Sequence, residues 1–120
     1  ALQHPLVTPA SQLPDSITEQ LQEKTVYDFG IQIQPDRFEF HETCSIIPNS
    51  LVVAYALAIA TSGAACRIFL AGFDGYGADD PRTVEMDMLF KNYASAENAL
   101  PVSAITPTRY KIPSTSIFAL

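Results

Sequence analysis

The feature that most constrains this chain is an uncharged apolar block that leads directly into a glycine-bearing loop. Residues 43–66 contain no charged side chain, and the alanine-rich run 51–60 lies between Pro48-Asn49-Ser50 and Gly63. This pattern predicts a helix with Asn49 or Ser50 as its N-cap and Gly63 as its stop. Residues 67–71 then form an apolar run that ends at a glycine, as expected of a strand covered on both faces in a parallel sheet. A helix followed by a buried strand indicates an α/β unit.

The apolar run is too short to span a membrane. A spanning helix needs about 20 predominantly apolar residues, whereas prolines and small polar residues confine this run to residues 51–60. The first five residues have no basic leader and no apolar core, so we expect no signal peptide. We expect a cytoplasmic protein in which Cys44 and Cys66 are reduced thiols packed in the core, rather than a disulfide.

Length and charge narrow the class of protein further. The chain has 120 residues, which suits a single domain but not a complete (β/α)₈ barrel, because a barrel needs roughly 200 residues or more. Seven basic residues stand against 13 acidic ones, and the formal net charge is −6. Phosphate-backbone binding requires a basic stripe, so this balance argues against a nucleic-acid partner. The chain begins with Ala1, which fits an excised C-terminal domain of a longer protein or the removal of an initiator Met.

Beyond this block, the chain predicts short strands and one amphipathic helix. Residues 25–33 alternate with apolar side chains on odd positions, which is typical of one half-buried strand. Asp80-Pro81 has the chemistry of a helix start, and the helix after it carries a stripe predicted to be buried: Met86, Leu89, Phe90 and Tyr93. We expect further short strands near residues 6–7, 38–40 and 102–105, and a helical turn at 16–23. The predicted fold class is a three-layer, Rossmann-like α/β domain with a small, mostly parallel sheet and residues 67–71 at its centre.

The best candidate ligand site is the loop 72–77, because open α/β sheets bind ligands beyond the carboxyl ends of their strands. Gly72 and Gly75 would let the backbone approach a ligand, Asp74 would hold a hydroxyl group, and Tyr76 belongs to the same loop. Asn49 and Ser50 would face the same crevice. Without a ligand, Gly72 and Gly75 would be turn formers, Asp74 a hydrogen-bonding loop residue, and Asn49 and Ser50 ordinary helix caps. The glycine spacing matches neither the dinucleotide fingerprint nor a phosphate loop.

Other candidates have weaker signals. His41 next to Glu42 would suit acid–base chemistry or be an ordinary surface residue. Arg109 and Lys111 would receive a phosphate or carboxylate, or belong to a solvated turn. The acidic residues between 79 and 87 favour a helix N-terminus over a cation site. We therefore expect no metal, no cofactor and no assignable catalytic residue.

Three strings in the C-terminal half carry a resemblance to a known family. Residues 70–76 (LAGFDGY), 80–82 (DPR) and 105–110 (ITPTRY), running on to 116–120 (SIFAL), resemble the C-terminal domain of aldolases of the hydroxymethylglutaryl-CoA-lyase-like class, also described as 4-hydroxy-2-oxovalerate aldolase-like, from bacterial surface-polysaccharide clusters. More distantly, residues 48–76 resemble the core of sialyltransferase-like and motility-accessory-type domains, whose crevice receives a nucleotide sugar.

The resemblance implies a role for the domain but supplies no catalytic residues. In such aldolases the metal and the carbon–carbon bond chemistry belong to an N-terminal barrel, for which this chain is too short. The implied function is a non-catalytic C-terminal accessory domain that partners this barrel and either binds a sugar-nucleotide-like or phosphorylated ligand or organises subunits in a homo-oligomer. The alternatives are a trimmed glycosyltransferase-like enzyme that uses the same crevice, and a pure assembly module.

Overall fold

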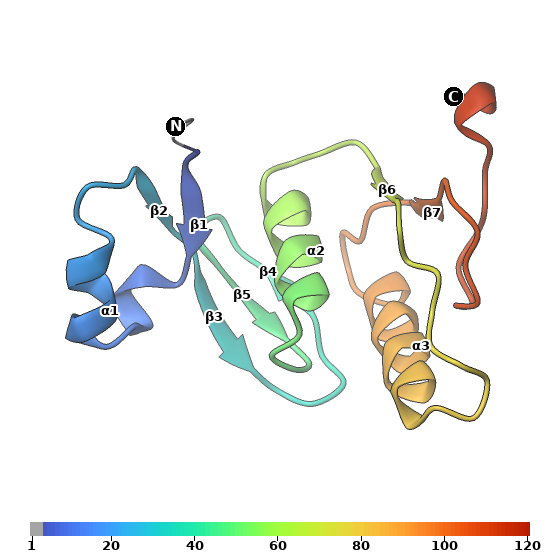
Figure 1. The fold of residues 1–120 in the computed structure, drawn as a ribbon, viewed down its shortest axis with the longest axis horizontal. Coiled ribbons are helices and arrows are strands. Elements are labelled where there is room, and N and C mark those ends of the chain that lie inside the picture. Colours follow the sequence, from blue (N-terminus) through green and yellow to red (C-terminus); the bar gives the residue numbers. More distant parts are fainter. Residues whose placement is uncertain (1–3) are drawn as a thin grey trace.

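The chain folds as an α/β domain whose strands form small, mainly parallel sheets (Figure 1). The computed structural model describes residues 4–120, so most of the N-terminal stretch in which we expect no signal peptide lies outside the described residues. Strand β1 (Leu6–Thr8) pairs in parallel with β2 (Val26–Asp28). A 3-10 turn, η1 (Ala10–Gln12), and the short helix α1 (Asp15–Gln20) connect them. These elements match the extended piece and the helical turn that the sequence predicts.

The second sheet contains an element that the sequence analysis missed. Strand β3 (Gly30–Ile33) pairs in parallel with β5 (Cys44–Ile47), and β5 also pairs in antiparallel fashion with β4 (Glu39–Phe40). The extended piece predicted near residues 38–40 is therefore confirmed. No strand was predicted at β5, because its four residues show no clear alternation and end at Pro48.

The prediction of one half-buried strand over residues 25–33 is wrong. The Phe29 N–H donates to Thr8 O, while the next N–H, that of Gly30, donates to Thr43 O. Because the segment changes partner at this point, no single layer covers its odd-numbered side chains. Phe29 is buried, but Tyr27 and Ile33 are 59% and 49% exposed.

Helix α2 (Val52–Ser62) packs on β4 and β5 and ends at Gly63, as predicted. Its N-cap is Leu51, however, and neither Asn49 nor Ser50 caps it. The physical reason is that Asn49 Oδ1 accepts the Leu51 N–H at 3.1 Å, so this side chain stabilises the turn before the helix.

The C-terminal half contains a βαβ unit in which β6 (Ile68–Leu70) and β7 (Val102–Ala104) pair in parallel and α3 (Pro81–Ala94) connects them. The prediction of a strand at residues 67–71 is thus confirmed. The prediction that this strand lies at the centre of a sheet and is covered on both faces is wrong. Among the described residues β6 has β7 as its only strand neighbour, and Phe69 is 39% exposed. Because the sheet of β6 has two strands within residues 4–120, β6 is an edge strand, whereas α2 packs mainly on β4 and β5.

The predicted stripe of α3 forms the middle of the core. Asp80 is the N-cap and accepts the Arg82 N–H, Pro81 starts the helix, and all four stripe residues are buried. The core is continuous between the two halves of the chain, because Phe29 and Ile47 belong to the same buried cluster as Leu70 and Phe90. No helix within residues 4–120 has both the length and the apolar character needed to cross a bilayer.

Both cysteines are free thiols, but they are exposed, so the prediction that they pack in the core is wrong. Side chains alternate across a strand, and the buried positions of β5 are Ser45 and Ile47. Cys44 therefore falls on the outer face of β5. Cys66 lies in the exposed turn between α2 and β6.

Tyr55 makes the stability of the fold sensitive to alkaline pH. Its hydroxyl donates to Phe29 O at 2.6 Å. Burial, together with the negative charge of Asp28, raises the pKa of Tyr55 to about 12. A folded-state pKa above the unfolded value of about 10 gives stability that is complete below pH 10 and is lost as pH rises toward 12.

Between pH 10 and 12, we expect the unfolding free energy of the wild type to fall more steeply with pH than that of Tyr55→Phe, as measured by urea denaturation. Equal slopes would contradict this role of Tyr55.

Candidate functional site

The loop 72–77 lies where the carboxyl ends of two parallel strands meet. It leaves β6 after Ala71, and its first N–H, that of Gly72, donates to Thr106 Oγ1 at 2.8 Å, just beyond β7. The Ile105 N–H donates to Leu70 O at 2.9 Å and keeps the two strand ends together. The predicted position of the loop relative to the strand is therefore confirmed. This is the location at which α/β sheets commonly bind ligands.

The loop adopts a conformation that requires glycine at two positions. Gly72 and Gly75 have φ angles of +78° and +102°, a region that L side chains rarely adopt. A Cβ atom on Gly75 would come within 3.0 Å of Arg109 Cβ. The Arg109 N–H also donates to Asp74 O at 2.9 Å. The loop is thus held closely against the segment that follows β7.

A pocket of about 820 Å³ lies between this loop, β6 and the first turns of α2. We call it the loop pocket. Its floor is apolar, and Asp74 is the one charged side chain among its lining residues within the described chain. Its two most exposed aromatic side chains are Phe69 at 39% and Tyr76 at 36%. The pocket therefore offers aromatic faces and one carboxylate to a ligand.

Four of the six predicted site residues line this pocket: Gly72, Asp74, Gly75 and Tyr76. Asn49 and Ser50 do not belong to its lining. The next two residues, Leu51 and Val52, line it instead, and Val52 is 83% exposed. The start of α2 therefore lies beside the loop, but through Leu51 and Val52 rather than through Asn49 and Ser50.

Two arginines lie beside Tyr76. The Arg82 guanidinium is 4.0 Å from the centre of the Tyr76 ring and is also hydrogen-bonded to Asp80. These hydrogen bonds from Arg82 lower the pKa of the Asp80 carboxyl to about 2. Arg109 Nη1 donates to Tyr76 O at 3.4 Å, and no carboxylate within residues 4–120 forms an ion pair with Arg109. Arg109 is thus the cation beside the loop that is free to meet an anion.

The other sequence candidates lie elsewhere or are occupied. His41 contacts Glu39 at 3.1 Å rather than Glu42, on the exposed end of β4. The Lys111 N–H donates to Asp87 Oδ1 at 2.9 Å, so the two predicted basic residues contact different parts of the fold. Among residues 4–120, no three His, Cys, Asp or Glu side chains converge in a way that would hold a metal ion.

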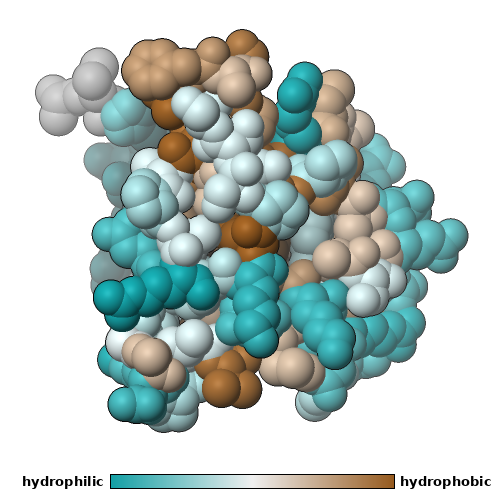
Figure 2. Space-filling model, turned by 90° about the vertical axis from the view of Figure 1, so that its right-hand side faces the viewer, coloured by the Kyte–Doolittle hydropathy of each residue, from teal (hydrophilic) through white to brown (hydrophobic). Residues whose placement is uncertain are grey.

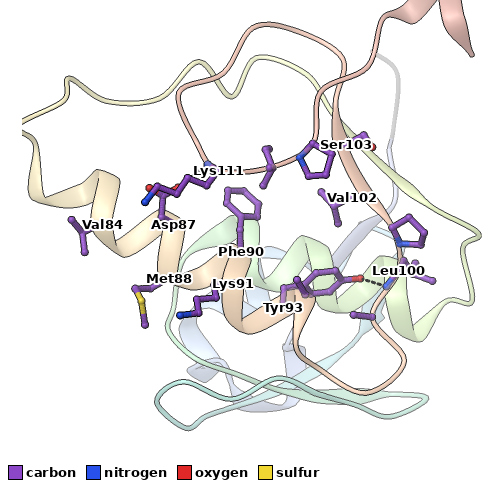
Figure 3. Close-up of a pocket in the computed structure, with 15 residues that line it drawn as sticks. Val84, Asp87, Met88, Phe90, Lys91, Tyr93, Leu100, Val102, Ser103 and Lys111 are labelled. Carbon is purple, nitrogen blue, oxygen red and sulfur yellow. Dashed lines mark hydrogen bonds between the residues drawn. The ribbon is translucent and has the colours of Figure 1, made fainter.

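Sequence reasoning missed a second pocket, of about 800 Å³, between α3 and β7 (Figure 3). We call it the α3–β7 pocket. Val84 and Met88 lie on α3 outside the buried stripe, and both line this pocket. These two apolar residues on an otherwise polar helix face are the signal that could have indicated it.

Comparisons of the chain with known protein families, with curated proteins and with solved structures find no match. The fold and the two pockets are therefore the basis for a functional proposal.

Proposed function

We propose that this chain is a non-catalytic α/β domain that binds a sugar-nucleotide-like or phosphorylated ligand in the loop pocket. One observation carries the proposal. A glycine loop at the carboxyl ends of two parallel strands opens onto a pocket of about 820 Å³, which is within the size range of small-molecule sites.

The side chains around the pocket suit the parts of such a ligand. The rings of Phe69 and Tyr76 are exposed, and although Arg67 and Arg82 each lie over one face of these rings, the other face would meet a base or a sugar. The Asp74 carboxylate accepts hydrogen bonds from hydroxyl groups. Arg109 does not line the pocket but contacts the Tyr76 carbonyl beside it, and its other guanidinium donors would pair with a phosphate that extends out of the pocket.

The resemblance in residues 70–120 extends the proposal to a larger protein. We infer a cytoplasmic, C-terminal accessory domain of an aldolase of the hydroxymethylglutaryl-CoA-lyase-like class, with the chemistry in an N-terminal barrel that this domain partners. The β6–α3–β7 unit supports a reduced Rossmann-like arrangement in the C-terminal half, and the three-layer form stays a prediction.

A thermal-shift titration tests the binding proposal. The panel consists of UDP-glucose, UMP and glucose 1-phosphate, with glucose as the uncharged control. A ligand present at 100 times its Kd stabilises the folded state by about 2.7 kcal/mol, so the Tm should rise with ligand concentration. Asp74→Ala and Arg109→Gln should each weaken this response, because each removes a polar contact from one part of the ligand.

Lys24→Gln is the matched control for Arg109→Gln, since it removes an exposed positive charge far along the chain from the loop. It should respond to the panel as the wild type does. A flat response of the wild type to every phosphorylated compound would contradict the proposal.

A catalytic role in the loop pocket has less support. The titratable side chains in its lining within the described chain are Asp74, Tyr76 and Tyr110, and none of them is hydrogen-bonded to another. Burial raises the pKa of Tyr110, which keeps its hydroxyl protonated at neutral pH. Within residues 4–120, the glycosyltransferase-like alternative therefore has no hydrogen-bonded acid–base pair in this pocket.

Assembly is the second candidate function, because the C-terminal segment is strongly apolar and exposed. Ile117, Phe118 and Leu120 are 56%, 95% and 63% exposed. The C-terminal end lies at the upper right in Figure 1. Figure 2 shows that right-hand side of the molecule face on, and apolar residues gather at its top. Such a patch favours contact with a second subunit or with the partner barrel. Sedimentation that shows a strict monomer at high protein concentration would exclude self-association.

A further inference from the structure

The α3–β7 pocket has an apolar floor built from two separate parts of the chain. Phe90 and Tyr93 project from α3 toward β7 and the segment after it (Figure 3). Leu100, Val102 and Ile112 complete the wall. The Tyr93 hydroxyl is already occupied, because it accepts the Leu100 N–H at 2.9 Å and contacts Thr61 Oγ1 at 2.6 Å. The floor therefore offers apolar surface rather than free polar groups.

The rim of this pocket carries apolar side chains that are largely exposed within residues 4–120. Val84 and Met88 lie one helical turn apart and are 67% and 43% exposed. They lie outside the stripe that α3 buries in the core. Their position at the edge of a pocket of about 800 Å³ indicates surface available to an apolar ligand.

Two lysines, Lys91 and Lys111, line the same pocket. Lys91 follows Asp87 by one helical turn, and the Lys111 N–H donates to Asp87 Oδ1 at 2.9 Å. This contact is made by the Lys111 backbone, and the side chains of Asp87, Lys91 and Lys111 all line the pocket. Neither lysine forms an ion pair within residues 4–120. The rim therefore carries two positive charges against one negative charge, on a chain whose net charge is −6.

We propose that the α3–β7 pocket binds an amphipathic carboxylate, a small molecule with one apolar chain or ring and one anionic head group. The apolar body lies against Phe90, Val102 and Ile112, and the carboxylate pairs with the ammonium groups of Lys91 and Lys111. The pocket volume matches a small molecule, and the excess of positive charge at its rim selects an anion over a cation of the same shape. This site is separate from the loop pocket and does not depend on the function proposed there.

Calorimetric titration of the whole chain with decanoate, below its critical micelle concentration, tests the proposal. Decanol and decyltrimethylammonium have the same apolar chain with a neutral and a cationic head group. We expect decanoate to bind with a stoichiometry of one, decanol to bind about tenfold more weakly, and decyltrimethylammonium to bind more weakly still, because each exposed ion pair contributes a modest factor.

Three variants separate the head-group contact from the apolar contact. The double variant Lys91→Gln with Lys111→Gln should bind decanoate about tenfold more weakly and reduce its advantage over decanol. Lys24→Gln removes one exposed charge elsewhere and should bind as the wild type does. Ala94→Trp places a large side chain at an exposed lining position, so it should fill the pocket and abolish binding of all three probes.

Specific outcomes would overturn the proposal. One is the absence of decanoate binding to the wild type. Another is an equal affinity for decanoate and decyltrimethylammonium, which would show that the lysines do not select the head group. Unchanged binding by a folded Ala94→Trp variant would place the ligand at another site. Competition with UDP-glucose, which is directed at the loop pocket, should not displace decanoate, so the failure of either proposal is distinguishable from the failure of the other.

Discussion

Replacing Tyr93 with alanine is expected to lower the free energy of unfolding by about 4 kcal/mol, because the change empties a large buried volume. Tyr93 is 1% exposed. Its ring packs edge-on against Phe38 and Phe40, with ring centres 5.4 and 5.8 Å away. These contacts join α3 to the β4 region of the other half of the chain. Urea denaturation followed by circular dichroism measures the loss.

The Tyr93 hydroxyl contributes separately, through a chain of hydrogen bonds in which each group has a partner. The Leu100 N–H donates to Tyr93 Oη, and Thr61 Oγ1 donates to Leu57 O at 2.7 Å. Each hydroxyl has one proton, so the Tyr93 hydroxyl must donate to Thr61 Oγ1.

Tyr93→Phe keeps the ring and removes this link, which leaves the Leu100 N–H without its partner. We expect a loss of about 1–3 kcal/mol for that variant. Tyr27→Ala is the control at an exposed tyrosine and should change stability by less than about 0.5 kcal/mol. A Tyr93→Phe variant as stable as the wild type would contradict the hydrogen-bond chain.

Gly75→Ala is expected to destabilise the fold by about 2 kcal/mol and to weaken binding in the loop pocket. The new Cβ would meet Arg109 Cβ at 3.0 Å, and the φ angle of +102° is itself costly for alanine. The strain falls on the segment that holds Asp74 O against the Arg109 N–H. Denaturant unfolding gives the stability change, and the thermal-shift panel gives the change in binding.

Substitutions at two neighbouring glycines distinguish the close contact with Arg109 from the cost of the positive φ angle. Gly72→Ala also requires a positive φ angle but has open space around the added Cβ, so we expect a smaller loss of about 1 kcal/mol. Gly77→Ala has neither constraint and should be nearly neutral. Equal effects at all three positions would show that the close approach of Arg109 is unimportant.

Local signals predict those parts of the fold that local chemistry determines. Asp80 and Pro81 mark the start of α3, and the spacing of Met86, Leu89 and Tyr93 identifies its buried face. Gly63 marks the end of α2 in the same way. The strand before Gly72 and its glycine loop are also visible in the sequence, which is why the loop side of the pocket was predicted while the residues of α2 that line it were not.

Features that depend on the choice of strand partner were not predicted. The change of partner at Phe29 leaves no mark on the alternation of residues 25–33. The short strand β5 becomes apparent only through its pairing with β3 and β4. The position of β6 at a sheet edge depends on its having β7 as its one strand neighbour within residues 4–120, and the exposure of Cys44 follows from which face of β5 is covered.

The α3–β7 pocket was missed for a related reason. Its lysines lie 20 positions apart in the sequence, at 91 and 111, and only the folded chain brings both to the lining of one pocket.

Amide chemical-shift mapping tests the central claim, ligand binding in the loop pocket, most directly. A uniformly ¹⁵N-labelled sample is titrated with UDP-glucose, UMP and glucose 1-phosphate in separate experiments. We predict saturable shifts that are largest at Gly72, Asp74, Tyr76 and Val52, the residues that surround the pocket. If none of the three compounds perturbs these amides, or if the shifts cluster on another surface, the proposed site is wrong.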